Sequence, residues 1–331
     1  MKKLFTILFT LSIFAGMTQP LPNQIGVVEK FDTELDKIVS QNAKAQIITE
    51  GFDWSEGALW IEKHKMLLFS DVPTNIIYKW TEAEGKEVYL KPSGYTGTIE
   101  RGGEMGSNGL LLDKDGHLVL CQHGDRRMAR MNAPLDKPQP NFVTLADKYD
   151  GKRLSSPNDA TYDSKGELFF TDPPYGLPKQ SDDDPGKETA WNGVYKVKNN
   201  GEVILLTDSL TRPNGLAFFP GEKKLLIANS DPQKPNWYIF DVEGDKLSNG
   251  KIFYHAVSQN GMKGLPDGLK IDKEGNVFAT GPGGIHIFNK DGKLLGRLRL
   301  DEATSNCSLS GDQKTLYITN DMYVLRFKMR D

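Results

Sequence analysis

One stretch of the chain decides the fold: DGLKIDKEGNVFAT, residues 267–280. Apolar and polar residues alternate over 268–272, a tight-turn sequence occupies 273–276, and a second apolar run covers 277–280. Alternation on both sides of a glycine-containing turn predicts two short antiparallel strands joined as a hairpin. The same pattern returns at DKDG, residues 113–116, which lies between the apolar runs 110–112 and 118–120.

Six copies of this hairpin pattern run along the chain at intervals of about fifty residues, the last interval being shorter. A third strand is expected after each hairpin, for example at 193–197 and 237–241. Many short antiparallel strands repeating at about forty to fifty residues are typical of a β-propeller. We therefore predict an all-β fold, a six-bladed β-propeller. A large open sandwich would not explain six equivalent copies.

The last copy ends close to the C-terminus and leaves room for three strands rather than four. A spare strand is predicted at Ala45–Thr49, just ahead of the first copy. We expect this N-terminal strand to join the last blade and close the ring, because closure removes exposed strand edges. The copies follow one another without a linker, so residues 19–331 are predicted to form a single propeller domain.

The first residues resemble an export signal. Two lysines precede an apolar run at 4–14, and small residues follow at 15–18. This order predicts a cleaved signal peptide over residues 1–18 and a periplasmic or secreted mature protein. A membrane-anchored N-terminus is the alternative.

Composition excludes several classes of partner. The net charge of −3 and the pI of about 6.0 offer no basic surface for nucleic acid. The chain has no second long apolar segment, so no membrane span is expected after signal cleavage, and no obligate protein partner is indicated. Cys121 and Cys307 fall on distant predicted blades, and we expect two free, buried thiols.

The first residue of every copy carries an oxygen-bearing side chain. In a propeller the innermost strands line one channel, so these residues should form a ring: Glu56, Asn108, Asn158, Asn214, Asp267 and Asn306. Buried carboxylates and amides are costly unless something satisfies them. Hard oxygen donors suit Ca²⁺ first, then Mg²⁺ or Mn²⁺, and suit structural Zn²⁺ poorly. An Asn or Asp before Gly is often only a turn residue, but six equivalent positions favour a shared site.

A second set of residues follows the ring positions by fourteen or fifteen residues, at the predicted ends of the second strands: Asp71, His123, Asp172, Asn229, Gly281 and Asn320. A hairpin of that length returns to its start, so this set is expected near the same mouth of the channel. The longest connection on that face, 173–192, is interpreted as a lid or substrate-contacting loop, with Tyr175 as its contact residue. His286 is expected to pack in the core.

Other catalytic motifs are missing from the sequence. The chain has no G-x-S-x-G, H-E-x-x-H or C-x-x-C pattern, which argues against a serine hydrolase, a zincin and a dithiol site. The glycine-rich segment 102–106 lacks the Lys-Ser/Thr pair of a phosphate-binding loop.

Taken together, these motifs resemble the SMP-30/gluconolactonase/LRE family, and the resemblance covers nearly all of the predicted mature chain. It is carried by Ser55–Gly57, Ser156–Asp159, Phe170–Gly176, Arg212–Leu216 and Pro266–Gly268. The stretch from 106–109 through 121–124 is similar to the bacterial gluconolactonase branch. The resemblance implies a six-bladed propeller that hydrolyses sugar lactones with a divalent cation.

The resemblance also implies roles for individual residues. The family's metal ligands fall on Glu56, Asn214 and Asp267, and its fourth polar position, which touches metal or substrate, falls on Asn158. Some relatives carry a substrate-binding arginine two residues before that asparagine, where this chain has Ser156.

We expect Asp267 to be the catalytic base, and Asn158, Tyr175, His123 and Asp172 to contact substrate or support proton transfer. The predicted substrate is a sugar lactone and the predicted cofactor is one divalent cation, Ca²⁺ before Mg²⁺, Mn²⁺ or Zn²⁺. Two alternatives stay open. The same site serves related propeller hydrolases of other lactones, esters or phosphotriesters, and the cation could also be purely structural in a binding propeller.

Overall fold

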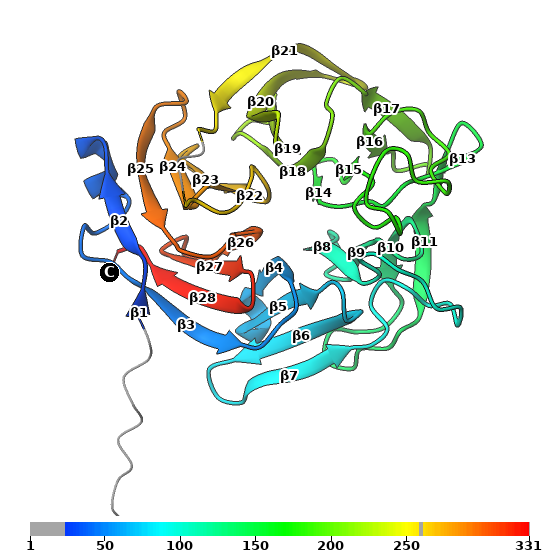
Figure 1. Cartoon of the computed structure of the whole chain (residues 1–331), viewed down its shortest axis with the longest axis horizontal. Coiled ribbons are helices and arrows are strands. Elements are labelled where there is room, and N and C mark those ends of the chain that lie inside the picture. Colours follow the sequence, from blue (N-terminus) through cyan, green and yellow to red (C-terminus); the bar gives the residue numbers. More distant parts are fainter. Residues whose placement is uncertain (1–23, 258–260, 331) are drawn as a thin grey trace, which may run out of the picture.

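The computed structural model describes residues 24–257 and 261–330. Its strands form six larger antiparallel sheets around a central axis, plus one short ribbon (Figure 1). Each blade is given from its innermost strand outward. Blade one is β4–β7 (Ser55–Ile61, Met66–Asp71, Ile76–Thr81, Gly85–Leu90), and blade two is β8–β11 (Ser107–Leu112, Leu118–Gln122, Arg127–Met131, Phe142–Ala146). Blade three is β14–β17 (Ala160–Tyr162, Leu168–Asp172, Gly193–Val197, Val203–Thr207), and blade four is β18–β21 (Pro213–Phe218, Lys224–Asp231, Lys234–Glu243, Lys246–His255).

The last two blades each contain a fifth strand from the N-terminus. Blade five runs β22–β25 (Leu269–Ile271, Val277–Gly281, Gly284–Phe288, Leu294–Arg299) and ends on β2 (Val27–Lys30). Blade six runs β26–β28 (Asn306–Leu309, Thr315–Asn320, Tyr323–Lys328), then β3 (Ala45–Glu50) and β1 (Gln24–Ile25). The ribbon β12–β13 (Lys148–Tyr149, Lys152–Arg153) follows blade two. The six-bladed all-β fold predicted from the sequence is confirmed.

The N-terminal strand closes the ring as predicted. β3, blue in Figure 1, lies beside β28, red, and pairs with it in antiparallel register, with Gln46 opposite Arg326. The two added strands β1 and β2 were not expected. Gly26 alone separates β1 from β2, and the short 3₁₀ helix η1 (Thr33–Lys37), whose Leu35 is buried, lies between β2 and β3. η1 therefore lies on the path of the chain from blade five to blade six.

Local turn chemistry explains the hairpins. Asp272 begins the turn between β22 and β23, and its Oδ1 accepts the backbone N–H of Asn276 at 2.7 Å. Gly275 in the same turn has φ +86°, a conformation that favours glycine. A second 3₁₀ turn, η2 (Glu62–His64), joins β4 to β5.

The core is divided among the interfaces between blades. Large aromatic side chains such as Phe69, Phe169 and Phe278 are fully buried there. His286 packs in this core against Trp237, with ring centroids 5.3 Å apart, and burial lowers its pKa to about 3. Cys121 and Cys307 are both free and buried, as predicted.

The predicted signal peptide lies outside the described residues. Within 24–257 and 261–330, no helix has the length and apolarity needed to cross a membrane.

Candidate active site

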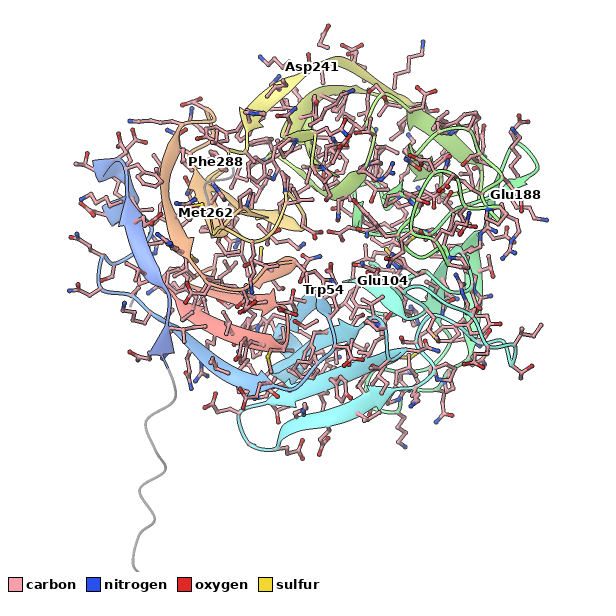
Figure 2. All side chains as sticks on the ribbon, viewed as in Figure 1. Trp54, Glu104, Glu188, Asp241, Met262 and Phe288 are labelled. Atoms are coloured by element: carbon pink, nitrogen blue, oxygen red, sulfur yellow. The ribbon has the colours of Figure 1, made fainter. Side chains whose placement is uncertain are left out.

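A cavity of about 330 Å³ lies at the channel between the inner strands. Figure 2 shows two of its wall residues, Trp54 and Glu104, close to the centre of the ring. Its lining combines acidic, amide, hydroxyl and apolar groups: Trp54, Glu56, Glu104, Asn108, Asn158, Tyr175, Asn214, Ser230, Gly264, Leu265, Asp267, Ala303 and Thr304. The structure thus gathers every predicted metal ligand, together with Asn108 and Tyr175, around one space.

Backbone irregularities aim the ring residues into this cavity. In blades one, two and four the inner strand shifts register next to the ring residue, between Glu56 and Leu59 in the first case. In blade five, Asp267 N–H donates to Thr280 O while Thr280 N–H donates to Gly268 O, so two residues oppose one. This arrangement is a β-bulge, which turns a side chain away from the regular alternation of a strand.

Blade six corrects the sequence-based alignment by one residue. Gly109 N–H donates to Asn158 O, and the equivalent bond in the last blades runs from Gly268 N–H to Ser305 O. Ser305, not Asn306, therefore occupies the sixth ring position. Its hydroxyl donates to Ser55 O at 2.6 Å, and it does not line the cavity.

Asn306 consequently takes the position that is glycine in four other blades. Glycine is needed there because the neighbouring blade lies so close that a Cβ on Gly57 would stand 2.1 Å from Asn108 O. Blade three also departs from glycine, with Asp159 at this position. Each side chain accepts the following backbone N–H, and Asn306 Nδ2 lies 3.4 Å from Asp159 Oδ2. Asp159 and Asn306 thus form a second polar level in the channel.

The carboxylates of the site repel one another. Burial, Glu104 and Asp159 raise the pKa of Glu56 to about 8. Burial and the charge of Glu56 also raise the pKa of Asp267 well above its usual range. Both groups therefore favour the protonated state unless a positive charge is supplied between them.

Three oxygens at the site lack partners. The Oδ1 atoms of Asn108, Asn158 and Asp267 are buried without a hydrogen bond among the described residues. Asn214 is oriented by a bond from its Nδ2 to Ser230 Oγ at 2.9 Å, and Ser230 in turn donates to Pro266 O. Unpaired hard oxygens beside two repelling carboxylates fit a hard divalent cation, and none of the described residues that line the cavity is a cysteine or a histidine.

The second predicted set of residues has a structural use. Asp172 accepts the backbone N–H groups of Ser155 and Ser156 at 2.8 and 2.7 Å, and it does not line the cavity. Asp71 accepts the N–H groups of Asp53 and Trp54 in the same way at 3.1 and 3.0 Å. Asn229 and Asn320 likewise bind backbone groups of the segment entering their inner strand. These side chains hold the loops that carry the site.

A carboxylate that only holds a loop and a carboxylate that contacts substrate should respond differently to mutation. Asp172→Ala and Asp71→Ala are each expected to lower the free energy of unfolding by about 1–3 kcal/mol, because each leaves buried N–H groups unpaired. Denaturant unfolding measures that loss. If Asp172 contacts substrate directly, Asp172→Ala alone would raise KM strongly, which contradicts a purely bracing role.

His123 lies behind the cavity wall. It is completely buried, and its Nδ1 stands 3.3 Å from Glu104 Oε2. His123 itself does not line the cavity, so its link to a substrate runs through Glu104. Glu104 was not predicted as a site residue, because segment 102–106 has no counterpart in the other copies and was compared only with a phosphate-binding loop.

Tyr175 comes from the long connection of blade three and reaches across to blade four. Its hydroxyl donates to Ser230 O at 3.2 Å, and burial raises its pKa, so it stays protonated. Trp54, Leu265 and Ala303 supply apolar wall that sequence reasoning did not identify, because they lie in loops rather than at repeated positions.

A separate acidic cluster lies at the turn between β8 and β9. Donor atoms of Asp113, Asp115 and His117 lie within 4.8 Å of one another. Asp113 Oδ1 accepts the N–H groups of Asp115 and His117, and Asp163 binds the turn of blade three in the same manner. We attribute this cluster to hairpin turn chemistry.

Known proteins share both sequence and architecture with this chain. The SMP-30/Gluconolactonase/LRE-like region model matches residues 54–321. A gluconolactonase of Zymomonas mobilis subsp. mobilis is 37% identical over 314 residues, covering 92% of this chain and 87% of that protein. A diisopropyl-fluorophosphatase of Loligo vulgaris is 28% identical over 220 residues, covering 64% of this chain and 67% of that protein.

Solved structures agree with this relationship. A gluconolactonase from Xanthomonas campestris has a TM-score of 0.79 and 26% identity, covering 95% of this chain and 99% of that one. The family match spans the site residues from Trp54 to Thr304. The chain belongs to the SMP-30/gluconolactonase/LRE-like family.

Proposed function

We propose that this chain hydrolyses sugar lactones to aldonic acids, using a divalent cation held by Glu56, Asn158, Asn214 and Asp267. One observation carries the proposal: these side chains converge on one cavity, and Oδ1 of Asn158 and of Asp267 is buried there without a partner. The 37% identity to a gluconolactonase supports a lactone as the substrate class. Oxygen donors alone favour Ca²⁺ over softer ions.

The chemistry divides between the cation and the chain. When bound, a divalent cation polarises a lactone carbonyl and makes a nearby water more acidic. Asp267 accepts the proton of the water that attacks the carbonyl carbon. The ring C–O bond then breaks, and the departing oxygen takes up the proton held by Asp267 to become a hydroxyl. Glu56 offsets positive charge, and the amide of Asn158 can bind a carbonyl or hydroxyl oxygen.

The cavity walls suit a sugar ring. Trp54 and Leu265 offer apolar surface, while the hydroxyls of Tyr175 and Thr304 offer polar contacts. A sugar lactone likewise presents C–H faces and a belt of hydroxyl groups. Pockets that bind small molecules commonly combine an apolar lining with a few placed polar groups.

A substrate panel tests the proposal. Purified protein is assayed with glucono-, galactono- and aryl lactones and with a phosphotriester, after chelation and after addition of Ca²⁺, Mn²⁺ or Zn²⁺. We expect sugar lactones to be hydrolysed fastest, and chelation to abolish turnover reversibly. Turnover that survives complete chelation would contradict the role of the cation.

The panel also decides between the alternatives. The relationship to a diisopropyl-fluorophosphatase makes phosphotriester hydrolysis the second candidate. A phosphotriester cleaved faster than every lactone would replace the first proposal with the second. A protein that binds the cation but hydrolyses none of the panel would be a binding propeller.

We also propose that the mature protein is exported, on the strength of the basic and apolar order of residues 1–18. The N-terminal sequence of the protein isolated from its natural source should begin after this segment. A mature protein that still begins at Met1 would contradict export by signal cleavage.

A further inference from the structure

A second cavity, of about 740 Å³, lies between the loops of blades two and three. None of its lining residues lines the active-site cavity. It is walled by segments 95–101, 124–127, 144–153 and 177–186, and its cationic side chains are Arg101, Arg126, Arg127, Arg153 and Lys179. Glu188, which accepts the backbone N–H of Arg153, lies toward the outer rim in Figure 2, well away from Glu104.

Most acidic groups of this cavity already have partners. Asp125 forms an ion pair with Arg127 at 2.9 Å and accepts from Thr96. Asp184 is buried and accepts the backbone N–H groups of Lys179 and Gly186. Asp147 is the remaining lining carboxylate. The remaining cationic side chains of the cavity therefore outnumber this carboxylate.

The side chain of Arg126 is the most informative feature of this cavity. Its side chain lines the cavity at only 7% exposure, its Nε donates to Leu154 O at 2.7 Å, and its Nη2 is buried without a partner among the described residues. Burial and the like charge of Arg153 lower its pKa, and the charges of Glu188 and Asp172 act in the opposite direction. Arg126 thus carries an unpaired buried donor in a side chain that lines the cavity, and buried donors normally have an acceptor.

Comparison with blade one shows that bracing does not require an arginine. Asn75 precedes β6 as Arg126 precedes β10, and both have φ +61°. Asn75 holds the loop before β8 through its amide oxygen, which accepts three backbone N–H groups. Asparagine tolerates this left-handed conformation, whereas arginine rarely adopts it. Blade two thus carries Arg126 at the position where, in blade one, the shorter Asn75 is sufficient to hold the neighbouring loop.

We propose that this cavity binds the oxyanion group, a carboxylate or phosphate, of a molecule of about sugar size, with Arg126 and Arg153 as its main ligands. Arginine suits this task because its planar fork of donors matches both groups. Arg101 shapes the same wall, since it donates to Gly124 O and to Gly176 O, next to Tyr175 of the active site. Arg153 is exposed and accessible from solvent.

Calorimetric titration of the full, cation-loaded protein tests the site. The probes are gluconate, inorganic phosphate and neutral glucose, and the variants are Arg126→Gln and Arg153→Gln. Arg299→Gln is the matched control, because Arg299 lies on β25 beside Glu29, remote from this cavity. We expect either substitution at the site to weaken anion binding by about tenfold or more, and the control to leave it unchanged.

The probes separate the sources of the oxyanion. Binding of gluconate and phosphate alike would show that the charged group is sufficient, whereas binding of gluconate alone would show that the sugar chain is also recognised. No anion binding, equal binding of glucose, or unchanged affinity in both variants would overturn the proposal. Should Arg126→Gln fail to fold, the exposed Arg153 decides the outcome. The titration needs no lactone turnover, so its failure leaves the proposed function standing.

Discussion

Asp267→Asn is expected to reduce sugar-lactone turnover by about 10²–10⁴-fold while the propeller remains folded. The substitution keeps the size of the side chain but removes the carboxylate that accepts the proton of the attacking water. It also removes one of two repelling buried acids, so the chelated variant should unfold at a higher temperature than the chelated parent. Initial rates with glucono-δ-lactone and a thermal melt measure both effects.

The matched control for this experiment is Asp272→Asn in the same blade. Asp272 holds the outer turn of the hairpin, where an asparagine can accept the same N–H group. It should retain the turnover of the parent within a few-fold. Near-normal turnover in Asp267→Asn would exclude the base and transfer the role to another group at the cavity, of which Glu104 is the first candidate.

Chelation is expected to reverse the pH dependence of stability between pH 6.5 and 8.5. In the chelated protein, burial raises the pKa of Glu56 from its ordinary 4.5 to about 8, and Asp267 is raised as well. Both carboxyls hold protons more tightly in the folded chain than in the unfolded chain. The stability that protonation provides is therefore lost as the pH rises through about 8.

The loaded protein should behave in the opposite way. A divalent cation binds the deprotonated carboxylates, so rising pH strengthens its binding and with it the folded state. Melting temperatures at pH 6.5, 7.5 and 8.5, with chelator or with excess Ca²⁺, should slope in opposite directions. His286 is neutral in the fold at a pKa of about 3, and its own effect is confined to the lower end of this range, where an unfolded histidine with a pKa of 6.5 binds a proton.

Glu56→Gln provides the control for the pH experiment. Removing this carboxyl should flatten the slope of the chelated protein and weaken Ca²⁺ stabilisation. Parallel slopes with and without Ca²⁺ in the parent protein would mean that the cation does not bind at Glu56 and Asp267.

Most of the ring could be predicted because its causes are local. Each hairpin is specified by alternating residues and a turn such as 272–276, and the spare strand predicted at Ala45–Thr49 was recognisable from the missing fourth strand. The ring of oxygen-bearing residues followed from their equivalence, since equivalent positions in a propeller meet at the axis, whereas the choice of metal ligands within it came from the family resemblance. The prediction of Asn306 as the sixth ring residue was wrong, because the sequence alignment of the last copy was shifted by one residue. The hydrogen bond from Gly268 N–H to Ser305 O reveals this shift.

Other features of the site have no periodic signal. Asp172 ends its strand at the predicted place, yet its oxygens bind backbone N–H groups of Ser155 and Ser156. No spacing argument could distinguish such a brace from a substrate contact, because both place a carboxylate near the channel mouth. Glu104 and Trp54 reach the cavity from loops whose path depends on packing against neighbouring blades.

The sequence by itself determined the number of blades, the closing strand and five of the six ring positions, because repeated local patterns suffice for these. Only the tertiary structure decided which side chains face the cavity. Bulges at the ring positions turn Glu56 and Asp267 inward, and burial together with the charges of neighbouring carboxylates raises their pKa values. The second cavity around Arg126 likewise depends on loops from two blades, and contacts between such distant segments leave no pattern along one chain.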